Sequence, residues 1–243
     1  MRTAQRSGVA AAAVLWAVAV AAAALPAAAQ VTFSVAAAPF VGKHAGVVGE
    51  THVGGIPVGI VDFDARARGI ELHVEGMPYA RTRRYGDPFD PSRSTIETGD
   101  ATVRLYTSPH LAFGIGYGVI ASTTDRIAPP GSFTSFADGV RLELHEAFDV
   151  TPNARLEATL GGLLQAHGTL HVYPGIPGAR DRYDAAAGTQ IDAEIRYIAL
   201  AHGPVSLGYG VRYVNQTIRY ARSTSLIDRN AGILPFVQLN VRL

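Results

Sequence analysis

The side chains of this sequence that could do acid–base chemistry stand at alternate positions of short segments. Glu71, His73 and Glu75 occupy every second position of one segment, and Glu143 and His145 do so in another. A histidine beside a carboxylate can act as a general base when a nucleophile lies within reach. No serine stands at a recognisable spacing from either histidine, so the sequence predicts no catalytic residue and favours a structural role for these charges.

Three other motifs could hold a metal ion or a nucleotide. His167 and His171 have a spacing that suits zinc on a helix, but the H-E-x-x-H glutamate is missing and the segment is strand-like. The acidic runs Asp62–Asp64 and Asp87–Ser92 offer oxygen ligands for calcium, although Asp-Pro pairs are primarily turn formers. The G-I-G-Y-G stretch Gly114–Gly118 lacks the third glycine of a dinucleotide motif. We therefore expect no metal site and no cofactor.

The segments that carry these side chains have the period of two that is typical of β-strands. Ile70, Leu72 and Val74 alternate with charged residues, and the pattern recurs at 140–145, 155–160, 190–197 and 237–243. Segments 111–119 and 207–212 set apolar residues against glycines. Helical periodicity is missing from the rest of the chain after position 30. The sequence predicts an all-β fold of antiparallel strands.

The polar positions of these strands carry charges of both signs, six carboxylates and six arginines. If the strands cross a membrane, an arginine on the lipid side costs about 2–4 kcal/mol at the midplane. The charges must then point inward, where opposite signs pair. We predict a structural charge network inside a barrel, formed by Glu71, His73, Glu75, Arg104, Arg141, Glu143, His145, Arg155, Glu157, Asp192, Glu194, Arg196, Arg212 and Arg242.

Alternation alone is also shown by a soluble β-sandwich, so the lengths of the connections decide between the two folds. Short turns fall near Thr107–His110, Thr151–Asn153 and Ala201–Pro204. Longer polar connections fall between them, near 78–97, 122–136, 168–187 and 221–231. Transmembrane β-barrels show this asymmetry between their two ends. The fold class that we predict is an antiparallel up-and-down transmembrane β-barrel.

The amino-terminal segment has the features of a secretory signal peptide. Arg2 and Arg6 precede an alanine-rich apolar run that ends at Pro26, and Ala27-Ala28-Ala29 follows as a small-residue cleavage site. We expect residues 1–29 to be removed and residues 30–243 to form the barrel domain. An uncleaved helical anchor is the alternative, because about 18 apolar residues can just span a bilayer.

The composition excludes one class of partner. The formal net charge is +1, with 21 Lys and Arg against 20 Asp and Glu, and cysteine is absent. Nucleic-acid binding needs clustered excess positive charge, which this balance does not provide. An exported chain without disulfides needs another source of stability, and a closed hydrogen-bonded barrel is one.

With its signal peptide, alternating strands and alternating connection lengths, residues 30–243 resemble the small bacterial outer-membrane barrels of the OmpA/OmpX type. The last strand, F-V-Q-L-N-V-R-L, is similar to that family's assembly signal, but it ends in Leu243 where the family has an aromatic residue. The resemblance implies a place in the bacterial outer membrane and contact with the barrel assembly machinery. Pro235 is expected near the loop end of that strand, where its missing N–H costs little.

The strand number is eight or ten. Counting back from the carboxyl end gives eight strands, the first of which begins near Ala67. Val31–Val41 and Ile56–Phe63 are weaker candidates for one more hairpin. Ten strands are preferred, because bacterial barrels have even counts. In the second candidate Ile56, Val58 and Ile60 share their face with Asp62, so a bulge, or eight strands with an amino-terminal lid, is the alternative.

For the function of such a barrel the sequence leaves three hypotheses. The first is a structural or surface-interaction role with a plugged or narrow lumen, in which the arginine-bearing loop Tyr79–Arg93 contacts outer-membrane lipid, including lipopolysaccharide phosphates. The second is a small diffusion pore, for which strand glycines would leave room. The third is a membrane-embedded hydrolase, by similarity to barrel enzymes such as the omptins, with His73 or His145 as base.

Overall fold

The computed structural model describes residues 30–46, 49–83, 93–127, 130–173, 182–220 and 223–243. Within these ranges the chain forms ten strands: β1 (Gln30–Gly46), β2 (Gly49–Ala67), β3 (Ile70–Arg83), β4 (Arg93–Tyr106), β5 (Leu111–Ile127), β6 (Pro130–Thr151), β7 (Ala154–Tyr173), β8 (Arg182–Ala199), β9 (Val205–Tyr220) and β10 (Ser223–Arg242). No helix in the described part is long and apolar enough to span a membrane.

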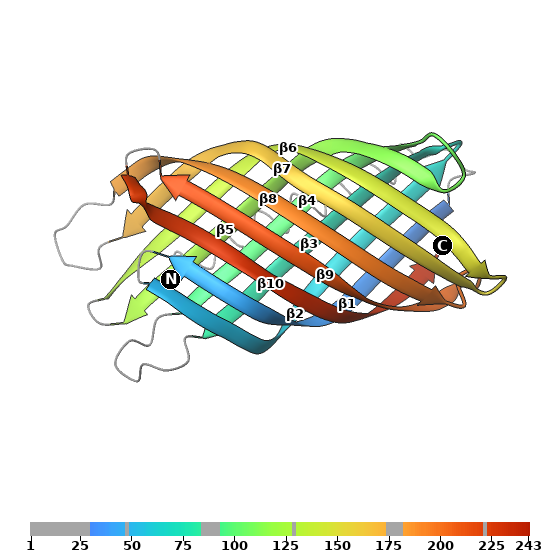
Figure 1. The fold of residues 1–243 in the computed structure, drawn as a ribbon, viewed down its shortest axis with the longest axis horizontal. Coiled ribbons are helices and arrows are strands. Elements are labelled where there is room, and N and C mark those ends of the chain that lie inside the picture. The colour runs from blue at the N-terminus through green and yellow to red at the C-terminus, as the bar shows by residue number, and fades with distance from the viewer. Residues whose placement is uncertain (1–29, 47–48, 84–92, 128–129, 174–181, 221–222) are drawn as a thin grey trace.

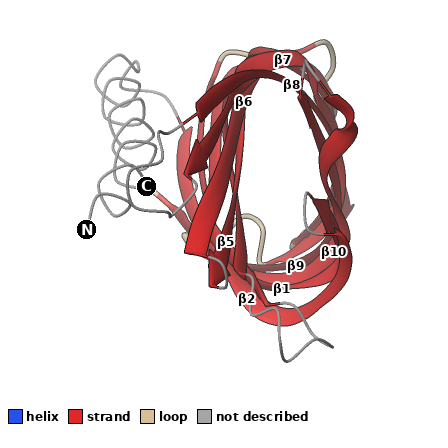
Figure 2. Cartoon of the chain, turned by 90° about the vertical axis from the view of Figure 1, so that its left-hand side faces the viewer, coloured by secondary structure: helices blue, strands red, loops and turns tan. Residues whose placement is uncertain are grey.

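Each strand pairs antiparallel with its neighbour in sequence, and β1 also pairs with β10, so the sheet closes into a barrel. The strands run obliquely around the long axis, and an end view shows the closed ring (Figures 1 and 2). The predicted all-β barrel is confirmed, and so is the preference for ten strands over eight. The two weak candidates are β1 and β2, which supply the extra hairpin.

Charged and apolar residues occupy opposite faces of the wall, as the alternation predicts. Leu142 and Ile195 are 44% and 60% exposed on the outside, whereas Arg141 and Glu194 are 4% and 8% exposed. An outer surface of leucine, isoleucine, valine and aromatic side chains suits contact with lipid.

The interior also contains apolar residues, which the sequence reasoning did not predict. One cluster, the first apolar plug, consists of Ala36, Ala38, Phe40, Ile60, Met77, Val214, Leu234 and Phe236. A second apolar plug consists of Ile120, Ala137, Leu163, Ala166, Leu170, Ala186 and Ile218. Ile60 and Asp62 therefore share the inner face of β2 without conflict, because the lumen is apolar along part of its length and charged along the rest.

The two ends of the barrel are connected differently. At one end, the turn end, β2 and β3 are joined by Arg68 and Gly69, with φ of 50° and 82°. A two-residue loop with positive φ at both positions matches the right-handed twist of a hairpin. At the other end the strands continue through much of the predicted loop sequence, and Ile127 of β5 still pairs with Pro130 of β6. The connection predicted over 122–136 is thus largely paired strand, because ladder hydrogen bonds form without apolar alternation.

Pro235 does not lie near a loop, which corrects the expectation from sequence. Strand β10 begins at Ser223, so Pro235 stands well inside the strand and faces outward. The strand extends further than its alternation indicates, since its first residues lack the apolar–polar pattern.

Candidate functional site

Arg104 on β4 is the centre of a buried ion-pair cluster inside the barrel. Its Nη1 donates to Glu71 of β3 at 2.7 Å, and its Nε donates to Glu143 of β6 at 2.5 Å. The Asp64 carboxylate lies 3.6 Å from the same Nη1, and the Tyr106 hydroxyl donates to Glu71 at 2.9 Å. One guanidinium therefore joins side chains from β2, β3, β4 and β6.

Arg141 extends the cluster across the lumen. It donates to both carboxylate oxygens of Asp192 on β8, at 2.7 and 2.8 Å, and lies 3.5 Å from Glu143. Gln190 donates to Asp192 at 2.9 Å. The paired donors of a guanidinium match the two oxygens of a carboxylate, which fixes the geometry of this link.

The remaining strands join through two more arginines. Arg196 donates to Glu157 at 2.7 Å and to Gln238 at 2.9 Å, and Gln238 donates to Asp62 at 2.9 Å. Arg212 donates to Glu194 at 2.8 Å and also to Glu75. Side chains of β2, β3, β8, β9 and β10 are thus tied together across the interior.

Eleven of the fourteen predicted network residues take part in these interior contacts, which the described residues form in two groups, one around Arg104 and Arg141 and one around Arg196 and Arg212. His73 belongs to the first group through a 2.7 Å contact with Asp64. The other three predicted residues lie at the margin of these groups or apart from them. Arg155 pairs at 3.1 Å with the exposed Asp149 near the turn end, and its nearest approach to Glu157 of the second group is 4.0 Å. Arg242 donates to the carbonyl oxygen of Ala201, and His145 contacts the Thr159 hydroxyl at 3.1 Å.

Three interior carboxylates were missed by the sequence reasoning. Asp62 and Asp64, which the sequence offers as calcium ligands, lie on the inner face of β2 and contact Gln238 and His73. Asp100 lies two and four residues from Thr102 and Arg104 on β4, and all three are buried. The period of two along 98–106 places Asp100 on the same face as Thr102 and Arg104, so the sequence pattern could have identified Asp100. With Asp62 and Asp100 included, the described residues hold seven buried carboxylates and three buried arginines, so the buried interior is more acidic than the six-to-six balance of the predicted network.

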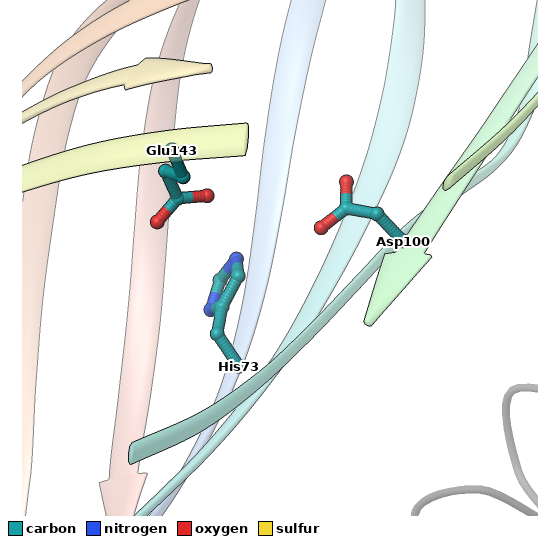
Figure 3. A group of neighbouring side chains, drawn as sticks. All are labelled: His73, Asp100 and Glu143. Carbon is teal, nitrogen blue, oxygen red and sulfur yellow. The ribbon is translucent and has the colours of Figure 1, made fainter. Parts of the chain in front are cut away.

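His73, Asp100 and Glu143 point toward one another from β3, β4 and β6 (Figure 3). Their donor atoms lie within 4.8 Å of one another, close enough to hold a metal ion. Glu143 already accepts a hydrogen bond from Arg104, and Arg141 Nε lies 3.4 Å from Asp100. These two guanidinium groups supply the positive charge that a metal ion would bring, so the donor set fits an ion-pair core better than a metal centre.

The inward glycines do not open a channel. A Cβ atom on Gly116 would overlap the Ala101 carbonyl oxygen, and one on Gly210 would overlap the Ile195 carbonyl oxygen. On Gly114 it would meet the Thr102 methyl group at 2.6 Å. The space that these glycines leave is filled by neighbouring backbone and side chains. The gap beside Asp100 and Arg141, lined by Thr98, Gly99, Asp100, Gly118, Val119, Arg141, Leu163 and Gln190, leaves no room for a water molecule.

The other candidate motifs are separated from this cluster. His167 and His171 lie four positions apart on strand β7, a spacing of roughly 13 Å along an extended chain, too far to share a zinc ion. Asp87–Ser92 lies outside the described residues, as do residues 1–29 with the predicted signal peptide.

Comparison with solved structures places the fold among bacterial outer-membrane proteins. The outer membrane protease OmpT of Escherichia coli is similar with a TM-score of 0.57 and 8% identity, over 88% of this chain and 96% of that one. A major outer membrane protein of Thermus thermophilus has a TM-score of 0.46 and 13% identity, over 89% of this chain and 100% of that one. No protein-family model and no curated protein matches the sequence. This chain has the fold of a bacterial outer-membrane β-barrel.

Proposed function

We propose that the chain is an integral outer-membrane protein with a structural or surface-interaction role and a lumen that is closed to ions. The observation that supports this proposal is the filling of the interior. The Arg104–Arg141 ion-pair cluster and the two apolar plugs occupy the lumen, and the inward glycines are packed against neighbouring atoms. Small barrels are expected to fill their interior with their own side chains.

Conductance in planar bilayers tests the closed lumen. We expect no stepwise current at saturating protein, while a general porin added to the same membrane shows that the bilayer responds. The test needs a folded sample, and a closed barrel migrates differently on detergent gels before and after boiling. Regular conductance steps from such a sample contradict the proposal. Steps selective for cations would then point to a pore along the carboxylate-rich interior.

The surface role rests on the arginine-bearing segment Tyr79–Arg93, whose arginine side chains lie outside the described part of the structure. Tyr79–Arg83 is the paired end of β3 and Arg93 begins β4, so the connection is shorter than predicted, and residues 84–92 join the two strands at the end of the barrel opposite the short turns. In the proposed orientation the short turns face the periplasm and this loop faces outward. Arginine forks bind phosphate groups bidentately, so lipopolysaccharide phosphate is the proposed partner.

Replacement of Arg81, Arg83 and Arg84 by Gln tests this partner. We expect the triple variant to bind lipopolysaccharide-containing vesicles more weakly than the parent chain, with the difference shrinking at high salt. Arg155→Gln, at the turn end, is the matched control and should leave binding unchanged. Equal binding by the triple variant and the parent would contradict the proposed role of these arginines in lipid binding. The proposal of a closed lumen would be unaffected.

A further inference from the structure

The pairing between β1 and β10, which closes the barrel, has a gap. These strands pair Ala37 with Val237 and Val41 with Ile233, and no pairing is formed at the positions between. The register on both sides of the gap places Pro39 directly opposite Pro235. We call this place the β1–β10 seam.

The two prolines remove a complete pair of hydrogen bonds from the wall. The Leu243 N–H donates to the Val31 carbonyl oxygen, so odd-numbered residues of β1 direct their backbone groups toward β10. Pro39 belongs to this series, and two ordinary residues facing each other here would exchange two N–H···O bonds. Proline has no N–H. Both bonds are therefore absent, because each proline's carbonyl oxygen faces the ring nitrogen of the other proline, which has no hydrogen to donate.

A neighbouring proline shows that this effect depends on position. Pro57 of β2 pairs with Pro39 on the other side of β1. The backbone groups of Pro39 point away from β2, so the Pro39–Pro57 contact loses no ladder hydrogen bond across that interface. Of these two contacts of Pro39, only the one across the β1–β10 seam is weakened.

The seam separates two apolar environments. On the outside, Val41, Ile233 and Val237 are 54%, 48% and 64% exposed in the lipid-facing surface. On the inside lies the first apolar plug, to which β1 contributes Ala36, Ala38 and Phe40, and β10 contributes Leu234 and Phe236.

An aromatic ring of the plug covers the seam from inside. The Phe40 ring extends from β1 across the seam and lies against Gly232 of β10, where a Cβ atom would come within 2.6 Å of it. The Phe236 ring lies against Gly210 of β9, on the side of β10 away from β1. Because these two glycines have no side chains, the rings can lie directly against the backbone of the wall.

We propose that the wall opens at the β1–β10 seam and admits a hydrocarbon chain from the bilayer into the first apolar plug, where it displaces the Phe40 ring. Opening there breaks no hydrogen bond between Pro39 and Pro235, in contrast to any fully paired part of the wall. An acyl chain or an alkane fits, because the plug is built from alanine, isoleucine, leucine, methionine, valine and phenylalanine side chains. A hydrocarbon chain that moves from the bilayer into the plug stays among apolar groups, so its apolar surface is never exposed to water.

Tryptophan quenching by brominated hydrocarbon tests the opening. The single tryptophan, Trp16, is replaced by Phe, and Phe40→Trp places a reporter at the inner face of the seam. Ile120→Trp is the matched control in the second apolar plug, on β5, which pairs with both neighbours without a register break. Val237→Trp, on the outside, gives the quenching of a fully lipid-exposed ring.

In vesicles of brominated phospholipid we expect the Phe40→Trp signal to be quenched about twofold more than the Ile120→Trp signal, because local opening admits chains only at the seam. The double variant Pro39→Val/Pro235→Val restores both donors and should reduce the quenching to the Ile120→Trp level. A second arm uses a brominated alkane in unbrominated vesicles. Quenching in the first arm identifies membrane acyl chains as the source, and quenching in the second arm alone identifies free hydrocarbon.

Two results overturn the inference. One is equal quenching of Phe40→Trp and Ile120→Trp in both arms. The other is strong quenching of Phe40→Trp that the valine pair leaves unchanged. If Phe40→Trp loses heat-dependent mobility on detergent gels, Leu234→Trp reports on the same plug. These readouts are independent of conductance, so the proposal of a closed lumen and the proposal of an opening at the seam can be contradicted separately.

Discussion

Arg104 and Arg141 illustrate how single residues hold this barrel together. Each lies within 4 Å of three carboxylate groups, and each is almost fully buried. Their partners come from strands that are not neighbours in the sheet, such as β3 and β6 or β6 and β8. A buried ion pair adds little by itself, but loss of one member leaves a charge without compensation.

We therefore expect Arg104→Gln to lower the free energy of unfolding by about 3–5 kcal/mol, because Glu71 and Glu143 lose their buried partner. Urea unfolding in lipid vesicles measures the change. Arg155→Gln is the control, since its pair with Asp149 is largely exposed, and its effect should be much smaller. Equal effects of the two substitutions would show that burial does not determine the strength of these pairs.

At the scale of residues, the sequence predicted most of the cluster but not its charge balance. Alternation identified Arg141, Glu143 and Glu194, because their apolar neighbours mark the opposite face. Asp62 was not predicted to face the interior, because Ile60 on the same face is apolar. The alternation therefore did not show which face of this strand points inward. The pairing itself, such as Arg141 with Asp192, depends on strand register across the lumen, and sequence alone does not give it.

Individual strands depend on glycines at places where backbones approach closely. A Cβ atom on Gly116 of β5 would overlap the Ala101 carbonyl oxygen of β4, and a backbone atom cannot move aside as a side chain can. Gly59 of β2 has no atom within 4 Å of the same position.

We expect Gly116→Ala to destabilise the barrel by about 1–3 kcal/mol through overpacking. Gly59→Ala should be close to neutral because its added methyl group meets open space. Unfolding midpoints in urea compare the two variants. A neutral Gly116→Ala would mean that β4 and β5 separate easily at this point.

The turn between β2 and β3 offers a gain in stability. Arg68 has φ of 50°, a conformation that is costly for most side chains, and Gly69 follows with φ of 82°. Arg68→Asn creates the Asn-Gly pair that this hairpin turn prefers. We expect it to raise the free energy of unfolding by about 0.5–1 kcal/mol, since asparagine tolerates the left-handed region. Gly69→Ala should lower it, and the opposite order of the two variants in urea unfolding would contradict this account.

The element boundaries show where prediction from sequence stops. The strands with strict alternation were recognised, since one face contacts lipid and the other faces charge. β1 and β2 were uncertain because the inner face of Phe40 and Ile60 is as apolar as the outer face. The extension of β5 and β6 to Ile127 and Pro130 was missed, because paired strands beyond the membrane need no alternation.

At the scale of the whole molecule, the amino terminus of the mature chain is still a prediction. We expect the protein recovered from outer membranes to begin at Gln30, because the small residues Ala27–Ala29 follow the helix-breaking Pro26. Intact-mass measurement of the purified protein tests this directly. A mass that includes residues 1–29 would favour the uncleaved anchor.

The pairing of Thr32 with Arg242 has a consequence for how the molecule is made. The first and last strands must meet before the ring is complete, so the barrel cannot close until β10 has been synthesised. Until the last segment arrives, two unsatisfied edges remain available to any other extended chain, which is a route to aggregation. We therefore expect the chain to reach its membrane before the wall closes, and the pairing of β1 with β10 to complete the barrel.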